Sequence, residues 1–183
     1  MNIRQLLLAV FVALPAVATG QSSPTVVIIA RHAEKGTTPA NDPPLTETGV
    51  ARAKALAVAV ADAKIQAVIT TQLLRTRETA RPAAEARGLT METVAVSGAA
   101  SAHAQAVADA VRKHAGKTVL VVGHSNTVNL IVGALGGPKI VDLCDSQYSN
   151  LYTLVLDGAS ARLVVGTYGA PSPDVPTGCP VMK

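Results

Sequence analysis

The sequence predicts an α/β fold, a three-layer sandwich with a mostly parallel central sheet, helices on both faces and a C-terminal β-hairpin. Apolar, β-branched runs alternate with alanine-rich stretches of helical periodicity, which is typical of parallel strands joined by helices. Near the C-terminus, two further strand-like runs flank Asp157-Gly158-Ala159-Ser160, a pattern that favours a hairpin. Together these patterns predict one layered domain.

The elements are expected in a regular order along the chain. Strands are predicted at 25–30, 67–70, 93–96 and 118–122, and the two hairpin strands at 152–156 and 162–167. Helices are predicted to begin at 45 and 73, to cover 101–115, and to begin again near 125 and end at Gly136-Gly137-Pro138. Thr46 is the expected N-cap of the first helix, because its hydroxyl can accept an amide hydrogen of the first turn.

The first twenty residues are typical of a secretory signal peptide. Arg4 precedes the apolar run 6–14, and Ala16-Val17-Ala18 offers small residues at cleavage spacing. The run is shorter than the roughly 20 residues that cross a bilayer, so no membrane span is expected; the alternative is a disordered segment or a retained anchor. Residues 21–183 then form one catalytic domain of 163 residues (183 − 20) in a periplasmic or secreted protein.

The composition excludes some partners and favours others. The formal net charge of +4 falls to +3 without Arg4, and without Phe11 the only aromatic residues besides histidine are three tyrosines. A single-stranded nucleic-acid binder needs stacking platforms in a basic groove, so nucleic acid is not an expected partner. The two cysteines, Cys144 and Cys179, could form one disulfide in an exported protein or remain two free thiols.

Basic residues follow three of the predicted strands. Arg31 and His32 end the first strand, His124 ends the strand at 118–122, and Arg75 lies in the first turn of the helix after 67–70. The carboxyl ends of parallel strands share one edge of the sheet, where open α/β folds bind ligands. Two histidines and two arginines at this edge predict a phosphate pocket that contains its own nucleophile.

The predicted chemistry needs neither a metal nor a cofactor. A neutral imidazole can attack phosphorus directly, and two guanidinium groups can bind the phosphoryl oxygens through paired, charge-assisted hydrogen bonds. The alternative, a metal site built from His32, Glu34 and His124, is disfavoured because the charges of Arg31 and Arg75 would oppose a cation.

Four segments also resemble, in order, the signatures of the histidine phosphatase (phosphoglycerate mutase-like) superfamily. They are Arg31-His32-Ala33-Glu34, Leu45-Thr46-Glu47-Thr48-Gly49, the block 70–80 with Glu78 where glutamine is usual, and Val122-Gly123-His124-Ser125-Asn126. The resemblance implies that His32 is the phosphoacceptor and that Arg31, Arg75 and His124 bind the phosphoryl group. Asn126 is a further candidate, either as a substrate contact or as a helix cap.

The resemblance also implies a residue that protonates the leaving group, commonly a glutamate or aspartate. Glu34, Asp145 and Glu92 are the candidates here. The expected function is an exported, metal-independent phosphoric monoester hydrolase of the histidine acid phosphatase type, acting on a small phosphorylated substrate. The alternative is a catalytically silent phospho-ligand-binding or regulatory module that keeps the pocket. A mutase of cytosolic intermediates is disfavoured by the export signal.

Overall fold

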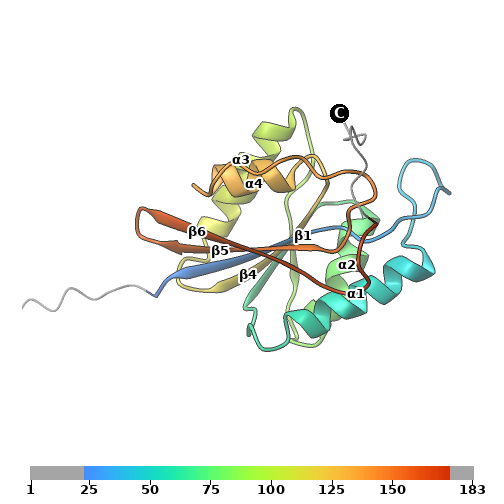
Figure 1. Ribbon diagram of the computed structural model, residues 1–183, viewed down its shortest axis with the longest axis horizontal. Coiled ribbons are helices and arrows are strands. Elements are labelled where there is room, and N and C mark those ends of the chain that lie inside the picture. The colour runs from blue at the N-terminus through green and yellow to red at the C-terminus, as the bar shows by residue number, and fades with distance from the viewer. Residues whose placement is uncertain (1–22, 174–183) are drawn as a thin grey trace, which may run out of the picture.

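A six-stranded mixed sheet forms the centre of the computed structural model, which describes residues 23–173 (Figure 1). Its strand order is β3-β2-β4-β1-β5-β6. Four strands are parallel: β1 (Thr25–Arg31), β2 (Ala67–Thr70), β3 (Met91–Thr93) and β4 (Thr118–Gly123). The hairpin of β5 (Asn150–Asp157) and β6 (Ser160–Thr167) adds to β1 in antiparallel orientation. The predicted mostly parallel sheet and C-terminal hairpin are confirmed.

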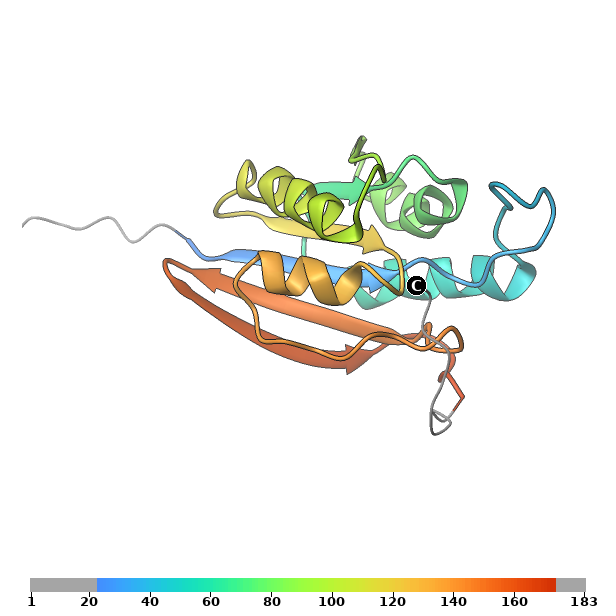
Figure 2. The ribbon, with the colours of Figure 1, turned by 90° about the horizontal axis from the view of Figure 1, so that it is seen from above.

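Helices cover both faces of this sheet (Figures 1 and 2). On one face, α1 (Glu47–Ala59) and α2 (Leu74–Glu85) pack on a core that includes Ile28 and Leu120. On the other, α3 (Ala100–Arg112) and α4 (Val128–Ala134) pack on a core that includes Ile29 and Val121. Successive strand residues point to opposite faces, so unbroken apolar runs supply both cores. The predicted three-layer sandwich is confirmed.

The structure corrects some of the predicted boundaries. β3 ends at Thr93, whereas the sequence placed the strand at 93–96. The amide of Val96 donates to the side chain of Gln72 at 2.8 Å, so the chain has left the sheet by then. α3 ends at Arg112 instead of residue 115. α4 begins at Val128 and not near Ser125, because residues 124–127 form a turn in which Thr127 N donates to the carbonyl of His124.

Other predictions are confirmed or lie outside the described part of the chain. Thr46 caps α1 as expected, since its hydroxyl accepts from the amide of Gly49 at 3.1 Å. No helix within 23–173 is long and apolar enough to span a bilayer. The predicted signal peptide at 1–20 and Cys179 lie outside the described residues, so the cleavage and the Cys144–Cys179 pairing stay predictions.

Candidate active site

The ends of neighbouring strands bring the two predicted histidines together. β1 and β4 are parallel neighbours in which Arg31 is in register with Gly123, and His32 and His124 are the next residues of the two chains. The imidazole centroids lie 5.3 Å apart in an edge-on arrangement. Both side chains are buried, with 0% and 4% of their surface exposed. Arg75 reaches the same edge from the first turn of α2, directly after β2.

Hydrogen bonding fixes the protonation of His32. Its Nδ1 lies 2.8 Å from the carbonyl oxygen of Ala33. A carbonyl can only accept, so Nδ1 carries the hydrogen and Nε2 keeps its lone pair. Burial holds the pKa of His32 well below its usual range, and the positive charges nearby act in the same direction. His32 is therefore neutral, with a buried lone pair on Nε2 that has no partner among the described residues.

The carbonyl that orients His32 is itself positioned by α2. The amide of Ala33 donates to the hydroxyl of Thr79 at 2.9 Å, and that hydroxyl donates to the carbonyl of Arg75 at 2.7 Å. One turn of α2 therefore carries Arg75 and also fixes the peptide beside His32. This explains why threonine follows arginine by four residues in the block 70–80.

Arg31 has hydrogen-bond partners for one of its terminal guanidinium nitrogens but none for Nε among the described residues. Its Nη1 donates to three carbonyl oxygens of the loop before β5, those of Cys144, Asp145 and Gln147, at 2.8–3.0 Å. The Tyr148 ring lies against the guanidinium at 4.1 Å. The Nε of Arg31 has no partner among the described residues. Burial lowers the pKa of Arg31, partly offset by Tyr148 and Asp145.

Unpartnered buried atoms converge at this edge of the sheet. Nine buried side-chain atoms lack a hydrogen-bond partner in the described part of the chain, and four belong to the predicted residues: Arg31 Nε, His32 Nε2, Arg75 Nε and His124 Nδ1. Buried polar atoms are nearly always hydrogen-bonded in native proteins. Two guanidinium donors and two imidazole nitrogens left open together therefore indicate the binding site of a polar ligand.

A cavity of about 330 Å³ opens beside two of these groups, Arg75 and His124. It is lined by Leu73, Arg75, Val96, Gly98, Ala100, His124, Asn126 and Thr127. Asn126 therefore faces the cavity, and it is not the cap of α4, which begins after Thr127. Within 23–173, no three His, Cys, Asp or Glu side chains are close enough to hold a metal ion.

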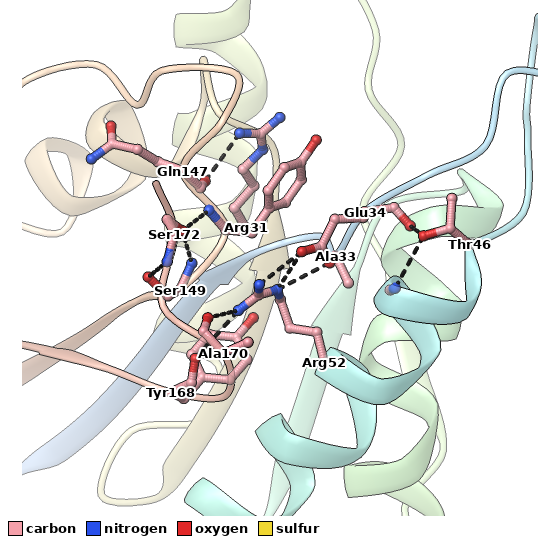
Figure 3. Close-up of polar contacts among 12 residues, drawn as sticks. Arg31, Ala33, Glu34, Thr46, Arg52, Gln147, Ser149, Tyr168, Ala170 and Ser172 are labelled. Atoms are coloured by element: carbon pink, nitrogen blue, oxygen red, sulfur yellow. Dashed lines mark hydrogen bonds and ion pairs between the residues drawn. The ribbon is translucent and has the colours of Figure 1, made fainter. Parts of the chain in front are cut away.

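The candidates for the leaving-group acid have different surroundings. The Glu34 carboxylate is held by Arg52, whose Nε and Nη2 donate to it at 2.7–3.0 Å (Figure 3). Glu92 lies 3.1 Å from His114, which precedes β4 at the opposite edge of the sheet. Asp145 is half-exposed and has its carboxylate 3.6 Å from Nη2 of Arg31. Of the three, Asp145 is the one beside a predicted phosphate-binding group.

Sequence reasoning missed other residues of the site. Asp42 accepts from the amide of Leu74 at 3.0 Å and lies 4.0 Å from Nη1 of Arg75. Tyr148 covers Arg31, and its ring lies 6.4 Å from that of His32. Both residues lie in loops without a periodic pattern, so only Asn41-Asp42-Pro43-Pro44, a turn-like sequence, gave any local signal.

Residues 27–95 match the family model of histidine phosphatase superfamily branch 1. The segment includes the nucleophile candidate His32, Arg75 and the helix start at Thr46. Over this segment, the chain is similar to the histidine phosphatase superfamily. By sequence, no curated protein matches it.

Solved histidine phosphatase structures share the fold. YhfR of Bacillus stearothermophilus superposes with a TM-score of 0.61 at 18% identity, over 77% of this chain and 96% of that one. The protein histidine phosphatase SixA in complex with tungstate gives 0.61 at 19% identity, over 78% and 96%. A putative phosphohistidine phosphatase SixA from Agrobacterium tumefaciens gives 0.59 at 24% identity, over 81% and 99%. At these identities the likeness shows the α/β fold.

Proposed function

We propose that this protein is an exported, metal-independent phosphatase that hydrolyses small phosphomonoesters through a phosphohistidine intermediate on His32. One observation carries the proposal: a neutral, buried His32 keeps an unpartnered Nε2 lone pair beside two arginines whose Nε atoms are also unpartnered. A phosphoryl group fits this arrangement, because it offers an electrophilic phosphorus and acceptor oxygens at once. A structural neighbour that is a protein histidine phosphatase bound to tungstate, a tetrahedral oxyanion, supports the same class of ligand.

The proposed reaction has two steps. In the first, Nε2 of His32 forms a bond to phosphorus, the ester P–O bond breaks, and the leaving oxygen takes the electron pair and a proton. Nδ1 of His32 keeps its hydrogen and continues to donate it to the carbonyl of Ala33, which keeps the ring oriented. In the second, water attacks phosphorus and gives a proton back to the group that protonated the leaving oxygen. The P–N bond breaks, its electron pair returns to Nε2 and inorganic phosphate leaves.

The arginines supply the positive charge in both steps. Arg31 and Arg75 bind the phosphoryl oxygens through donors that have no partner among the described residues. We assign the leaving-group proton to Asp145, because Glu34 and Glu92 are engaged elsewhere. Replacing Asp145 with Asn should then slow alkyl phosphates far more than aryl phosphates, whose leaving groups need no proton.

The decisive experiment is an aryl phosphatase assay of the protein lacking residues 1–20, with EDTA present. Activity should survive EDTA and fall by at least about 10³-fold in His32→Ala, and an acid-labile phosphoprotein should be trapped only in the parent. His114→Ala is the matched control, because His114 lies at the opposite edge of the sheet and pairs with Glu92. Unchanged activity in His32→Ala would refute the proposal.

A second candidate function is favoured by the pairing of Glu34 and Glu92 away from the pocket. With fewer acids available, the protein would be a catalytically silent phospho-ligand binder. Phosphate binding that is lost in Arg75→Ala, without turnover of aryl or alkyl phosphates, would identify this function.

Export rests on the sequence of residues 1–20. N-terminal sequencing of the protein recovered from the periplasm or the medium should find a start between Thr19 and Gln21. Recovery of the intact chain in the cytoplasm alone would refute export and leave the phosphatase proposal unaffected.

A further inference from the structure

We propose that two buried threonines, Thr71 and Thr76, fix the tautomer of His124, so that the pocket binds a phosphoryl group together with one proton. The inference rests on the proposed function and deepens it, because it specifies the protonation state in which the ligand is bound. It assigns Thr71 and Thr76 as positioning residues that act through His124.

The first step is the direction of the threonine hydroxyls. Oγ1 of Thr76 lies 2.8 Å from the carbonyl oxygen of Leu73. Two oxygens this close need a hydrogen between them, and a carbonyl has none to give, so the Thr76 hydroxyl donates to Leu73. Oγ1 of Thr71 lies 2.9 Å from Oγ1 of Thr76. The single hydrogen of Thr76 is already used, so the Thr71 hydroxyl donates in this contact.

The same count of donors and acceptors then determines which ring nitrogen of His124 carries the hydrogen. Its Nε2 lies 3.3 Å from Oγ1 of Thr71. Because the Thr71 hydrogen points to Thr76, the imidazole donates and Nε2 carries the hydrogen. The amide of Leu73 also donates to Oγ1 of Thr71, at 3.3 Å, as expected for an oxygen that acts as an acceptor. Thr71 and Thr76 are 1% and 0% exposed, so the chain of hydrogen bonds is closed within the protein.

The consequence is a lone pair on Nδ1 of His124, which has no partner among the described residues. The pocket therefore presents imidazole lone pairs from both His32 and His124, whose ring centroids are 5.3 Å apart. The dianion of a phosphomonoester has only acceptor oxygens, so its contact with Nδ1 of His124 is repulsive. One proton between Nδ1 and a phosphoryl oxygen turns this repulsion into a charge-assisted hydrogen bond.

The charged groups around His124 explain why the proton is taken up with the ligand and is not already present. Burial and the charges of Arg75, His103 and Arg31 hold the pKa of His124 at about 3 in the empty pocket. These groups come from α2, α3 and β1, and β1 also leads to His32, which is neutral. Asp42 and Asp145 lie beside Arg75 and Arg31 respectively and partly offset their charges. The negative charge of a bound phosphoryl group offsets the remainder and raises the pKa of His124.

The first test is ¹⁵N NMR of the ligand-free protein at neutral pH. The spectrum should show His124 with Nε2 protonated and Nδ1 unprotonated, whereas His32 should show the reverse. On addition of tungstate, a dianion whose oxygens are all acceptors, Nδ1 of His124 should acquire a proton and Nε2 of His32 should not. A His124 protonated on Nδ1 in the free protein, or a proton that appears on His32 instead, would overturn the inference.

The second test counts protons by calorimetry of tungstate binding in buffers of different ionisation enthalpy, at a pH where tungstate is a dianion without hydrogens. Binding should take up one proton, and tungstate affinity should fall about tenfold per pH unit. In Thr71→Val, Nδ1 is free to carry the hydrogen, so uptake and pH dependence should both be lost. Thr71→Ser keeps the hydroxyl and should behave like the parent.

The outcomes separate the inference from the proposed function. Tungstate binding without proton uptake in the parent would overturn the inference alone. Proton uptake retained in Thr71→Val would overturn the role of the threonines. Absence of tungstate binding, or full activity in His32→Ala, would contradict the proposed function, and the inference would fall with it.

Discussion

Arg31 and Arg52 are buried arginines on opposite sides of the end of β1, and they differ in whether all their guanidinium nitrogens have hydrogen-bond partners (Figure 3). Arg31 and Arg52 are 3% and 5% exposed. All three guanidinium nitrogens of Arg52 donate within the protein, to Glu34 and to the carbonyls of Tyr168 and Ala170. Arg31 uses Nη1 for three loop carbonyls and leaves Nε without a partner among the described residues. Among the described residues, the Arg52 network has no unpartnered donor, whereas that of Arg31 leaves one donor for the proposed phosphoryl ligand. We therefore interpret Arg52, whose guanidinium nitrogens all have partners, as a residue that supports the fold. Arg31, which keeps a buried nitrogen without a partner, is interpreted as a residue that binds the ligand.

The same substitution at both arginines tests this comparison and has the largest expected effect. Arg31→Lys keeps a charge that can satisfy the loop carbonyls, but it loses the planar fork that also reaches a phosphoryl oxygen. We expect kcat/KM for an aryl phosphate to fall by about 10²- to 10³-fold, with little change in melting temperature. Arg52→Lys should lower the melting temperature and leave kcat/KM within about threefold. Equal losses of activity in both variants would contradict the distinction between a ligand-binding Arg31 and a structural Arg52.

Removing Arg52 altogether should show how much its ion pair stabilises the fold. Arg52→Met leaves the Glu34 carboxylate, which is 20% exposed, without its partner. We expect a loss of about 3 kcal/mol of unfolding free energy, measured by urea denaturation, or roughly 6–12 °C in melting temperature. The double variant Arg52→Met/Glu34→Met should recover part of the loss, because no uncompensated charge remains.

Glu34→Gln tests whether the carboxylate paired with Arg52 supports the fold or protonates the leaving group. If Glu34 is architectural, the variant should lose stability and keep most of its kcat at all pH values. A large fall in kcat for alkyl phosphates, with stability retained, would instead make Glu34 the acid and displace Asp145 from that role.

The positions of those site residues that directly follow a strand could be predicted from the sequence. His32 and His124 each follow an unbroken apolar run, and parallel strands end at one edge, so their convergence followed from the pattern. Their protonation states did not, because these depend on the Ala33 carbonyl and the Thr71 hydroxyl at specific distances. The surroundings of Glu34 could not be foreseen either, since its partner Arg52 lies 18 residues away on α1.

The errors in the predicted fold have a similar origin. Residues 93–96 have strand propensity, but the side chain of Gln72 bonds to the backbone of Val96 and the strand ends at Thr93. Tyr148 and Asp42 lie in loops whose course is set by Arg31 and by the start of α2. In each case a long-range side-chain contact decides the structure, and no local periodicity encodes it.

A smaller effect is expected at Gly49, where α1 passes close to the Glu34 backbone. A Cβ at this position would lie 2.1 Å from the carbonyl oxygen of Glu34, so α1 would have to move. We expect Gly49→Ala to cost about 1–3 kcal/mol of unfolding free energy, and to lower activity by less than Arg31→Lys does. Gly133→Ala is the control, because a Cβ there meets nothing within 4 Å, and alanine in this helix should stabilise by about 0.5–1 kcal/mol.

The smallest effect is expected at Thr46, the N-cap of α1. Thr46 accepts from the amide of Gly49 at 3.1 Å, and its hydroxyl lies 3.3 Å from the carbonyl of Glu34. Thr46→Ala should lower the unfolding free energy by about 1 kcal/mol, because the first turn of α1 loses its acceptor, whereas Thr46→Ser should be close to the parent. Urea denaturation and steady-state kinetics on the same preparations measure both quantities. Since α1 carries Arg52 and none of the groups assigned to the phosphoryl group, kcat should be unchanged in both variants. A fall in kcat larger than the loss of stability can explain would mean that the side of β1 carrying Glu34 and Arg52 also sets the position of His32. The division between an architectural arginine and a functional one would then no longer hold.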